Sequence, residues 1–172
     1  KIIPALIPTS RAAFISALRV LKDVRAKVLG EALGNVLMKR RTECATVLAL
    51  TCKPEEIISK AKAKTLIYTS NVEPLILLDD YLKKKGFMPI MATGKTEVEF
   101  NRDFAKFDSV AELNPILATF DFLREGLPIT AANTIVLLNR PYRQYIWDQV
   151  IARALRLGQQ NQVYIIEVTL DT

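Results

Sequence analysis

The sequence predicts an α/β protein in which helices cover both faces of a parallel sheet. Short apolar segments, most of them β-branched, alternate five times with segments of helical periodicity. The connections between them are short, a pattern typical of parallel strands joined by right-handed helical crossovers. Half of the 172 residues are hydrophobic and 24% are charged, which supports a packed core and argues against disorder.

Residues 1–60 are predicted to be a mostly helical segment that leads into the α/β part. Helical spacing runs through residues 9–50, with a break where Gly30 and Gly34 weaken it. Pro54 is then placed to start a short helix. This segment holds eleven basic and five acidic residues, whereas the remainder holds thirteen of each, so it carries the whole net charge of +6. A polyanionic partner and a solvated helix surface both explain such an excess.

Five strands are expected in the second part, residues 61–172. Each is a short, mainly apolar stretch bounded by turn residues or charges. They cover residues 65–69, 88–92, 115–119, 134–139 and 163–168. Ligands of parallel α/β sheets bind beyond the carboxyl ends of the strands, so the segments that follow these strands are the places to look for a site.

Helices are expected between the strands. The first follows Ser70 or Asn71 as its N-cap and ends at Gly86, which comes after three lysines. Its buried face should consist of Leu75, Leu78 and Leu82. The second helix covers residues 96–107, and the third covers roughly 143–157.

The composition excludes several classes of site. Histidine is absent, which removes Ser-His-Asp and Cys-His catalysis and every zinc site that uses imidazole. Cys44 and Cys52 fit no CxxC pattern, so reduced thiols and no metal site are expected. No apolar run is long enough to cross a membrane. The chain begins with Lys1 and shows no secretory signal, so we expect an intracellular fragment of a longer protein.

Residues 92–97, ATGKTE, contain part of the phosphate-binding loop pattern G-x-x-x-x-G-K-[ST]. The position of the first glycine of that pattern is occupied by Pro89, which has no N–H to donate to a phosphate. The sequence therefore predicts no loop in this chain that holds a triphosphate by itself.

Two segments are better candidates for a site. Gln149, Arg153 and Arg156 recur at i, i+4 and i+7, so they should share one helical face. That face is either the solvent side of an ordinary helix or a phosphate-binding surface, for which the rigid fork of arginine is suited. The long connection at residues 118–133, which contains Gly126, is either a ligand loop or a plain surface turn.

Taken in order, these stretches resemble the second RecA-like lobe of superfamily 2 helicases, specifically the Swi/Snf type of double-stranded DNA translocase. Residues 64–87 are similar to the family's motif IV, and residues 116–139 to its motif V and the strand after it. The motif VI pattern, Q-x-x-x-R-x-x-R-x-G-Q, is matched position for position by Gln149, Arg153, Arg156, Gly158 and Gln159. Residues 1–50 resemble the helical segment that precedes this lobe.

The resemblance implies a role for each matched residue. Arg156 is similar to the arginine finger, which reaches the γ-phosphate of ATP held on the other lobe. Arg153 joins it at the interface between the lobes, and Gln149 helps to position both. Gly126 matches the motif V glycine near the nucleotide.

Thr119 matches the motif V threonine that lies near the nucleic-acid backbone, and Ser70 stands where motif IV approaches the phosphates. Two positions depart from the family's pattern. FDFLRE, residues 120–125, replaces a usual Ala-Gly-Gly run, and Leu155 replaces a frequent histidine.

By this resemblance the chain is expected to act within an ATP-dependent helicase or DNA translocase. ATP and Mg²⁺ would be held mainly by a missing N-terminal RecA-like lobe of the same protein, and the nucleic acid would be DNA, double-stranded and bound without sequence preference. The fragment alone should hydrolyse essentially no ATP. The sequence leaves open a catalytically silent protein- or nucleic-acid-binding module, strand separation in place of duplex translocation, and a location in cytoplasm or nucleus.

Overall fold

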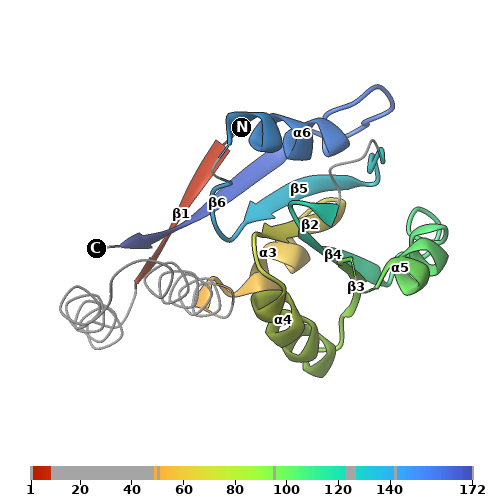
Figure 1. Cartoon of the computed structure of the whole chain (residues 1–172), viewed down its shortest axis with the longest axis horizontal. Helices are drawn as coiled ribbons and strands as arrows, with labels where there is room; N and C mark the ends of the chain where they lie inside the picture. Colours follow the sequence, from red (N-terminus) through yellow and green to blue (C-terminus); the bar gives the residue numbers. More distant parts are fainter. Residues whose placement is uncertain are drawn as a thin grey trace, which may run out of the picture.

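A computed structural model of the chain describes residues 2–8, 49, 51–94, 96–122, 127–141 and 143–171. In these residues six strands form one sheet in the order β1-β6-β5-β2-β4-β3, and all the pairings are parallel (Figure 1). The strands are β1 (Ile2–Pro8), β2 (Lys64–Thr69), β3 (Met88–Ala92), β4 (Leu113–Thr119), β5 (Ala132–Leu137) and β6 (Tyr164–Asp171). The described helices are α3 (Pro54–Lys60), α4 (Val72–Lys84), α5 (Glu97–Phe104) and α6 (Gln144–Ala154).

Each face of the sheet has its own apolar core. Successive residues of a strand point to opposite faces, so Leu66 and Tyr68 of β2 enter one core and Ile67 enters the other. The first core lies against α5 and α6 and includes Phe100 and Trp147. The second lies against α3 and α4, and its buried members are aliphatic. The predicted α/β class, with a parallel sheet and helices on both faces, is confirmed.

The five predicted strands are present as β2 to β6, with shifted ends. The exception is β3, which has its predicted bounds, whereas β6 runs three residues past its predicted end. β5 ends at Leu137, so the prediction that Asn139 belongs to the strand is wrong. The side chain of Asn139 instead bonds to Thr69, the last residue of β2, and to Ser70, which follows it. The helix at α4 is confirmed with Asn71 as N-cap, and Gly86 after it has φ +88°, a value that favours glycine.

The sequence did not predict β1. Two prolines in seven residues argue against a strand, because proline cannot donate to a ladder of hydrogen bonds. The conflict is resolved by position, since β1 is the edge strand and pairs with β6 alone. The predicted helices in residues 9–48 lie outside the described residues. Pro54 starts a short helix, α3, as predicted.

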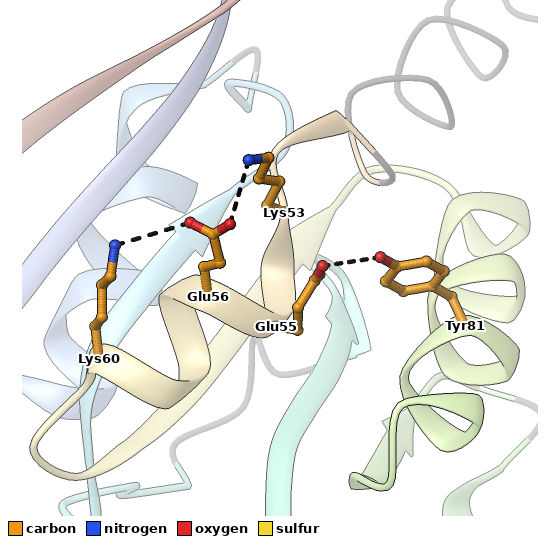
Figure 2. A network of polar contacts seen from close by, with 5 residues as sticks. All are labelled: Lys53, Glu55, Glu56, Lys60 and Tyr81. Carbon is orange, nitrogen blue, oxygen red and sulfur yellow. Dashed lines mark hydrogen bonds and ion pairs between the residues drawn. The ribbon is translucent and has the colours of Figure 1, made fainter.

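The segment before residue 61 contacts the α/β part through α3. Ile58 and Ala49 belong to the same buried core as Ile67. Polar contacts add to this packing: Tyr81 of α4 donates a hydrogen bond to Glu55 of α3 at 2.9 Å (Figure 2). The division at residue 60 stays a prediction, and these contacts cross it.

No helix among the described residues has the length and apolar character needed to cross a membrane.

Candidate functional site

The carboxyl ends of β2, β4 and β5 bring together two of the predicted site residues and one that was missed. Ser70 directly follows β2, and Thr119 is the last residue of β4. Thr69 and Thr119 pair across the two strands, so Ser70 and Thr119 lie at the same edge of the sheet. Asn139 reaches this edge from the turn after β5.

Asn139 holds the segment after β2 in place through three hydrogen bonds. Its Oδ1 accepts from the backbone N–H of Ser70 at 2.9 Å and from the hydroxyl of Thr69 at 2.8 Å. Its Nδ2 donates to the Ser70 hydroxyl oxygen at 2.5 Å. The signal that sequence reasoning overlooked was an amide side chain directly after a buried strand, at the edge where ligands bind.

Ser70 and Thr119 open into neighbouring hollows. Thr119 is buried and lines a hollow of about 400 Å³ together with Gly94 and Asn101. Ser70 is exposed and lines a second hollow of about 280 Å³ together with Arg143 and Tyr145. Asp121, directly after the turn at the end of β4, lies on the wall of both.

Basic and aromatic side chains meet at the start of α6, beside the Ser70 hollow. Arg143 donates to the hydroxyl of Tyr145 at 3.3 Å, and its guanidinium lies 5.9 Å from the centre of that ring. Arg140 lies 5.1 Å from the ring of Trp147. Both arginines are exposed, and sequence reasoning missed both.

The prediction that Gln149, Arg153 and Arg156 share one helical face is wrong for Arg156, which lies beyond the end of the helix. α6 ends at Ala154, not near residue 157, and Leu155 has ψ 73°, which turns the chain out of the helix. Arg156 therefore lies in the following turn. Gln149 and Arg156 are exposed, whereas Arg153 is buried at 4% exposure.

The turn after α6 is fastened to the sheet at the start of β5, away from the carboxyl edge. Gln159 donates through Nε2 to the carbonyl of Ala132, the first residue of β5, at 2.8 Å and to that of Ala154 at 3.1 Å. The start of α6 follows β5 at the carboxyl edge, whereas its end and Arg156 lie towards the opposite edge of the sheet. Arg156 lines a separate hollow of about 620 Å³ with the fully exposed Leu157.

Arg153 is held in an unusual environment. Its Nε is buried and has no hydrogen-bond partner among the described residues, and the same holds for the hydroxyl of Tyr68. Burial lowers the pKa of Arg153; the Tyr68 hydroxyl opposes that shift, and the positive charge of Arg156 adds to it. The guanidinium remains charged, because arginine loses its proton only at extreme pH.

The connection between β4 and β5 reaches the end of α6. The backbone N–H of Ile129 donates to the carbonyl of Arg153 at 2.9 Å. Gly126 itself lies outside the described residues. Among the described residues, no group of three or more His, Cys, Asp or Glu side chains gathers to hold a metal ion.

Comparison with known proteins finds a family and several relatives that match this chain. The family described as "Helicase conserved C-terminal domain" matches residues 47–158. The chain is 30% identical over 114 residues to the SNF2 domain-containing protein CLASSY 1 of Arabidopsis thaliana, covering 62% of this chain and 9% of that protein. It is 27% identical over 136 residues to the chromatin-remodeling ATPase INO80 of Saccharomyces cerevisiae, covering 77% and 9%. The chain thus spans about a tenth of the length of these relatives.

Solved structures share the fold. The SWI2/SNF2 ATPase core domain of Sulfolobus solfataricus superimposes with a TM-score of 0.74 at 14% identity, over 98% of this chain and 39% of that one. The same core in complex with dsDNA gives a TM-score of 0.68 at 16% identity, over 98% and 41%.

Proposed function

The chain belongs to the helicase conserved C-terminal domain family, as a RecA-like lobe of the Swi/Snf type, and from this premise we propose that it serves an ATP-dependent translocase on double-stranded DNA. In this proposal an N-terminal lobe of the same protein binds ATP and Mg²⁺. The present lobe contributes the arginine finger and one half of the nucleic-acid track. The names of the chromatin-remodeling relatives support a site of action in the nucleus.

The observation that carries the proposal is the placement of Arg156. It is an exposed arginine on a turn that is fastened to the sheet by the side chain of Gln159. An exposed guanidinium on such a support is suited to enter the active site of a facing lobe. Arg153, three residues earlier in the chain, is buried, and its Nε has no partner among the described residues. We propose that it supports the binding of the same nucleotide.

The chemistry asked of these arginines is charge stabilisation. Phosphoryl transfer to water needs positioning and the neutralisation of charge on the γ-phosphate, and an arginine finger contributes about 10³–10⁵ in rate. Closure of the two lobes on ATP assembles the site, and opening after hydrolysis releases it. Ser70 and Thr119 contact the nucleic-acid backbone at the other end of the lobe, so binding depends on salt and not on base sequence.

The decisive variant is Arg156→Ala in the full-length protein. We expect duplex-stimulated ATP hydrolysis to fall by about 10³-fold or more, with ATP binding retained, because the finger acts on the transition state. Arg156→Lys should recover little, since a lysine keeps the charge but lacks the planar fork.

Arg102→Ala is the matched control, because Arg102 is an exposed arginine on α5 that is paired with its neighbour Asp103. Its hydrolysis should equal that of the wild type. Unchanged hydrolysis in Arg156→Ala would instead favour a catalytically silent interaction module.

A further inference from the structure

The orientation of the Asn139 side chain is fixed by its partners. The backbone N–H of Ser70 only donates, so the Asn139 atom that faces it at 2.9 Å must be the amide oxygen. The other end of the amide is therefore the NH₂ group, and it faces the hydroxyl oxygen of Ser70 at 2.5 Å. An NH₂ group only donates, so the Ser70 oxygen accepts in this contact.

This assignment decides what the Ser70 hydroxyl offers. Because its oxygen accepts from Asn139, its own O–H is left to donate elsewhere. Ser70 is exposed and lines the hollow at the start of α6. The hydroxyl is thus a donor that faces solvent, on a backbone whose position Asn139 also holds.

Positive charge also lines this hollow. Arg143 lines it and is held by the hydroxyl of Tyr145 at 3.3 Å. Arg143 is also the N-cap residue of α6, and its side chain makes no capping hydrogen bond to that helix. The positive end of an eleven-residue helix therefore adds to the charge of the guanidinium.

We propose that this hollow is a subsite for one phosphate of the nucleic-acid backbone, in which Ser70 and Arg143 are the binding residues and Asn139 is the positioning residue that presents the Ser70 O–H. The subsite rests on the proposed function, and it extends the nucleic-acid track to residues that the motifs do not include. Asp121 also lines this hollow, and its negative charge repels an anion there, which lowers the affinity for a phosphate.

The first test is the salt dependence of duplex binding. Affinity of the full-length protein for a fluorescent DNA duplex of mixed sequence is measured by anisotropy over a series of salt concentrations. Arg143→Ala should weaken binding about tenfold and reduce the slope of log K against log[salt] by about 1, since one phosphate contact is lost. Asp121→Asn should tighten binding. Lys84→Ala is the control with the same loss of charge, at the C-terminal end of α4, and should leave the slope unchanged.

The second test is a double-mutant cycle on Asn139. In Asn139→Asp the carboxylate still accepts from the Ser70 N–H, but it also accepts the Ser70 O–H and so withdraws that donor from a phosphate. We expect this change to weaken duplex binding about tenfold in the wild type. In a Ser70→Ala background it should weaken binding only about threefold, because only the repulsion between the new carboxylate and the phosphate remains. Effects that simply multiply would overturn the positioning role.

The outcomes separate the subsite from the function. If duplex DNA stimulates hydrolysis by the wild type, but Arg143→Ala and Ser70→Ala bind the duplex as tightly as the wild type does, the subsite is wrong and the proposed function stands. If the wild type neither binds duplex nor is stimulated by it, both are wrong. Ser70 and Arg143 are exposed, so thermal unfolding of these two variants should match the wild type and keep the test valid even where Asn139→Asp is unstable.

Discussion

The two polar regions of this lobe are built in opposite ways. At the carboxyl edge, the amide of Asn139 makes three hydrogen bonds and leaves one exposed hydroxyl and one exposed arginine around a hollow. At the end of α6, the Nε of Arg153 and the hydroxyl of Tyr68 are buried without a partner in the described part of the chain.

The difference shows which arrangement folding alone explains. A buried donor without an acceptor costs about 1–3 kcal/mol, whereas a satisfied network costs nothing of the kind. At the carboxyl edge the amide of Asn139 finds its partners within the chain, so the stability of the fold is enough to explain this arrangement. Among the described residues nothing offsets the cost at the end of α6, an arrangement that is common where a site binds a second component.

Replacing Arg153 tests this contrast most strongly. In Arg153→Met we expect hydrolysis by the full-length protein to fall about 10²-fold, because a donor to the nucleotide site is lost. The same change should raise the free energy of unfolding by about 1 kcal/mol, because an apolar side chain of similar length fills the buried space. Steady-state ATPase assays and urea unfolding measure the two effects.

A Met variant that loses both activity and stability would contradict the contrast, since Arg153 would then be a structural residue. Arg102→Met on α5 is the control, because Arg102 is exposed and should change neither quantity.

Removing the fastening of the turn is expected to have the next largest effect. Gln159→Ala removes the side-chain donor to the Ala132 carbonyl and one of the two donors to the Ala154 carbonyl, which also accepts from the backbone N–H of Arg156, and should lower the free energy of unfolding by about 2 kcal/mol. Hydrolysis should fall with it, because Arg156 is no longer held in place. Gln160→Ala provides the comparison, since that side chain is exposed and reaches only the carbonyl of Gly158. Equal effects of the two changes would show that the fastening has no role.

The smallest effect is expected from Tyr68→Phe. It removes an unpartnered hydroxyl and keeps the ring that stacks on Phe120, so the free energy of unfolding at pH 7 should rise by about 1 kcal/mol. Burial raises the pKa of Tyr68, so the unfolded chain ionises first and stability is lost as the pH rises above about 10. That alkaline loss should be smaller in the variant.

Tyr81→Phe is the matched substitution on the surface. Its hydroxyl has a partner in Glu55, so the change should be neutral or destabilising (Figure 2). Stabilisation by Tyr81→Phe and not by Tyr68→Phe would reverse the contrast.

Much of the fold could be predicted because its signals are local. The face of α4 with Leu75, Leu78 and Leu82 follows from helical spacing, and the end at Gly86 follows from the need for positive φ. β1 could not be predicted, because its two prolines are compatible with a strand only at the edge of a sheet, and position in a sheet is not a local property.

The site was predictable in its residues but not in its geometry. Spacing placed Gln149, Arg153 and Arg156 on one face, but that inference assumes a continuous helix. The backbone of Leu155 ends α6 first, and the burial of Arg153 depends on packing against residues far away in the chain. Asn139 and Arg143 escaped notice because their roles arise only when the turn after β5 meets the end of β2.

The pairing of β1 with β6 also orders events during synthesis. Ile2 lies opposite Ile165, so this ladder closes a loop of almost the whole chain. Among the described elements β1 comes before all the others in the chain and β6 after them, and long-range strand pairing is slow because the closure entropy comes before any contact. Within this lobe, β1 therefore joins the sheet only after β6 has formed, and the nascent lobe must keep that strand from other partners until then.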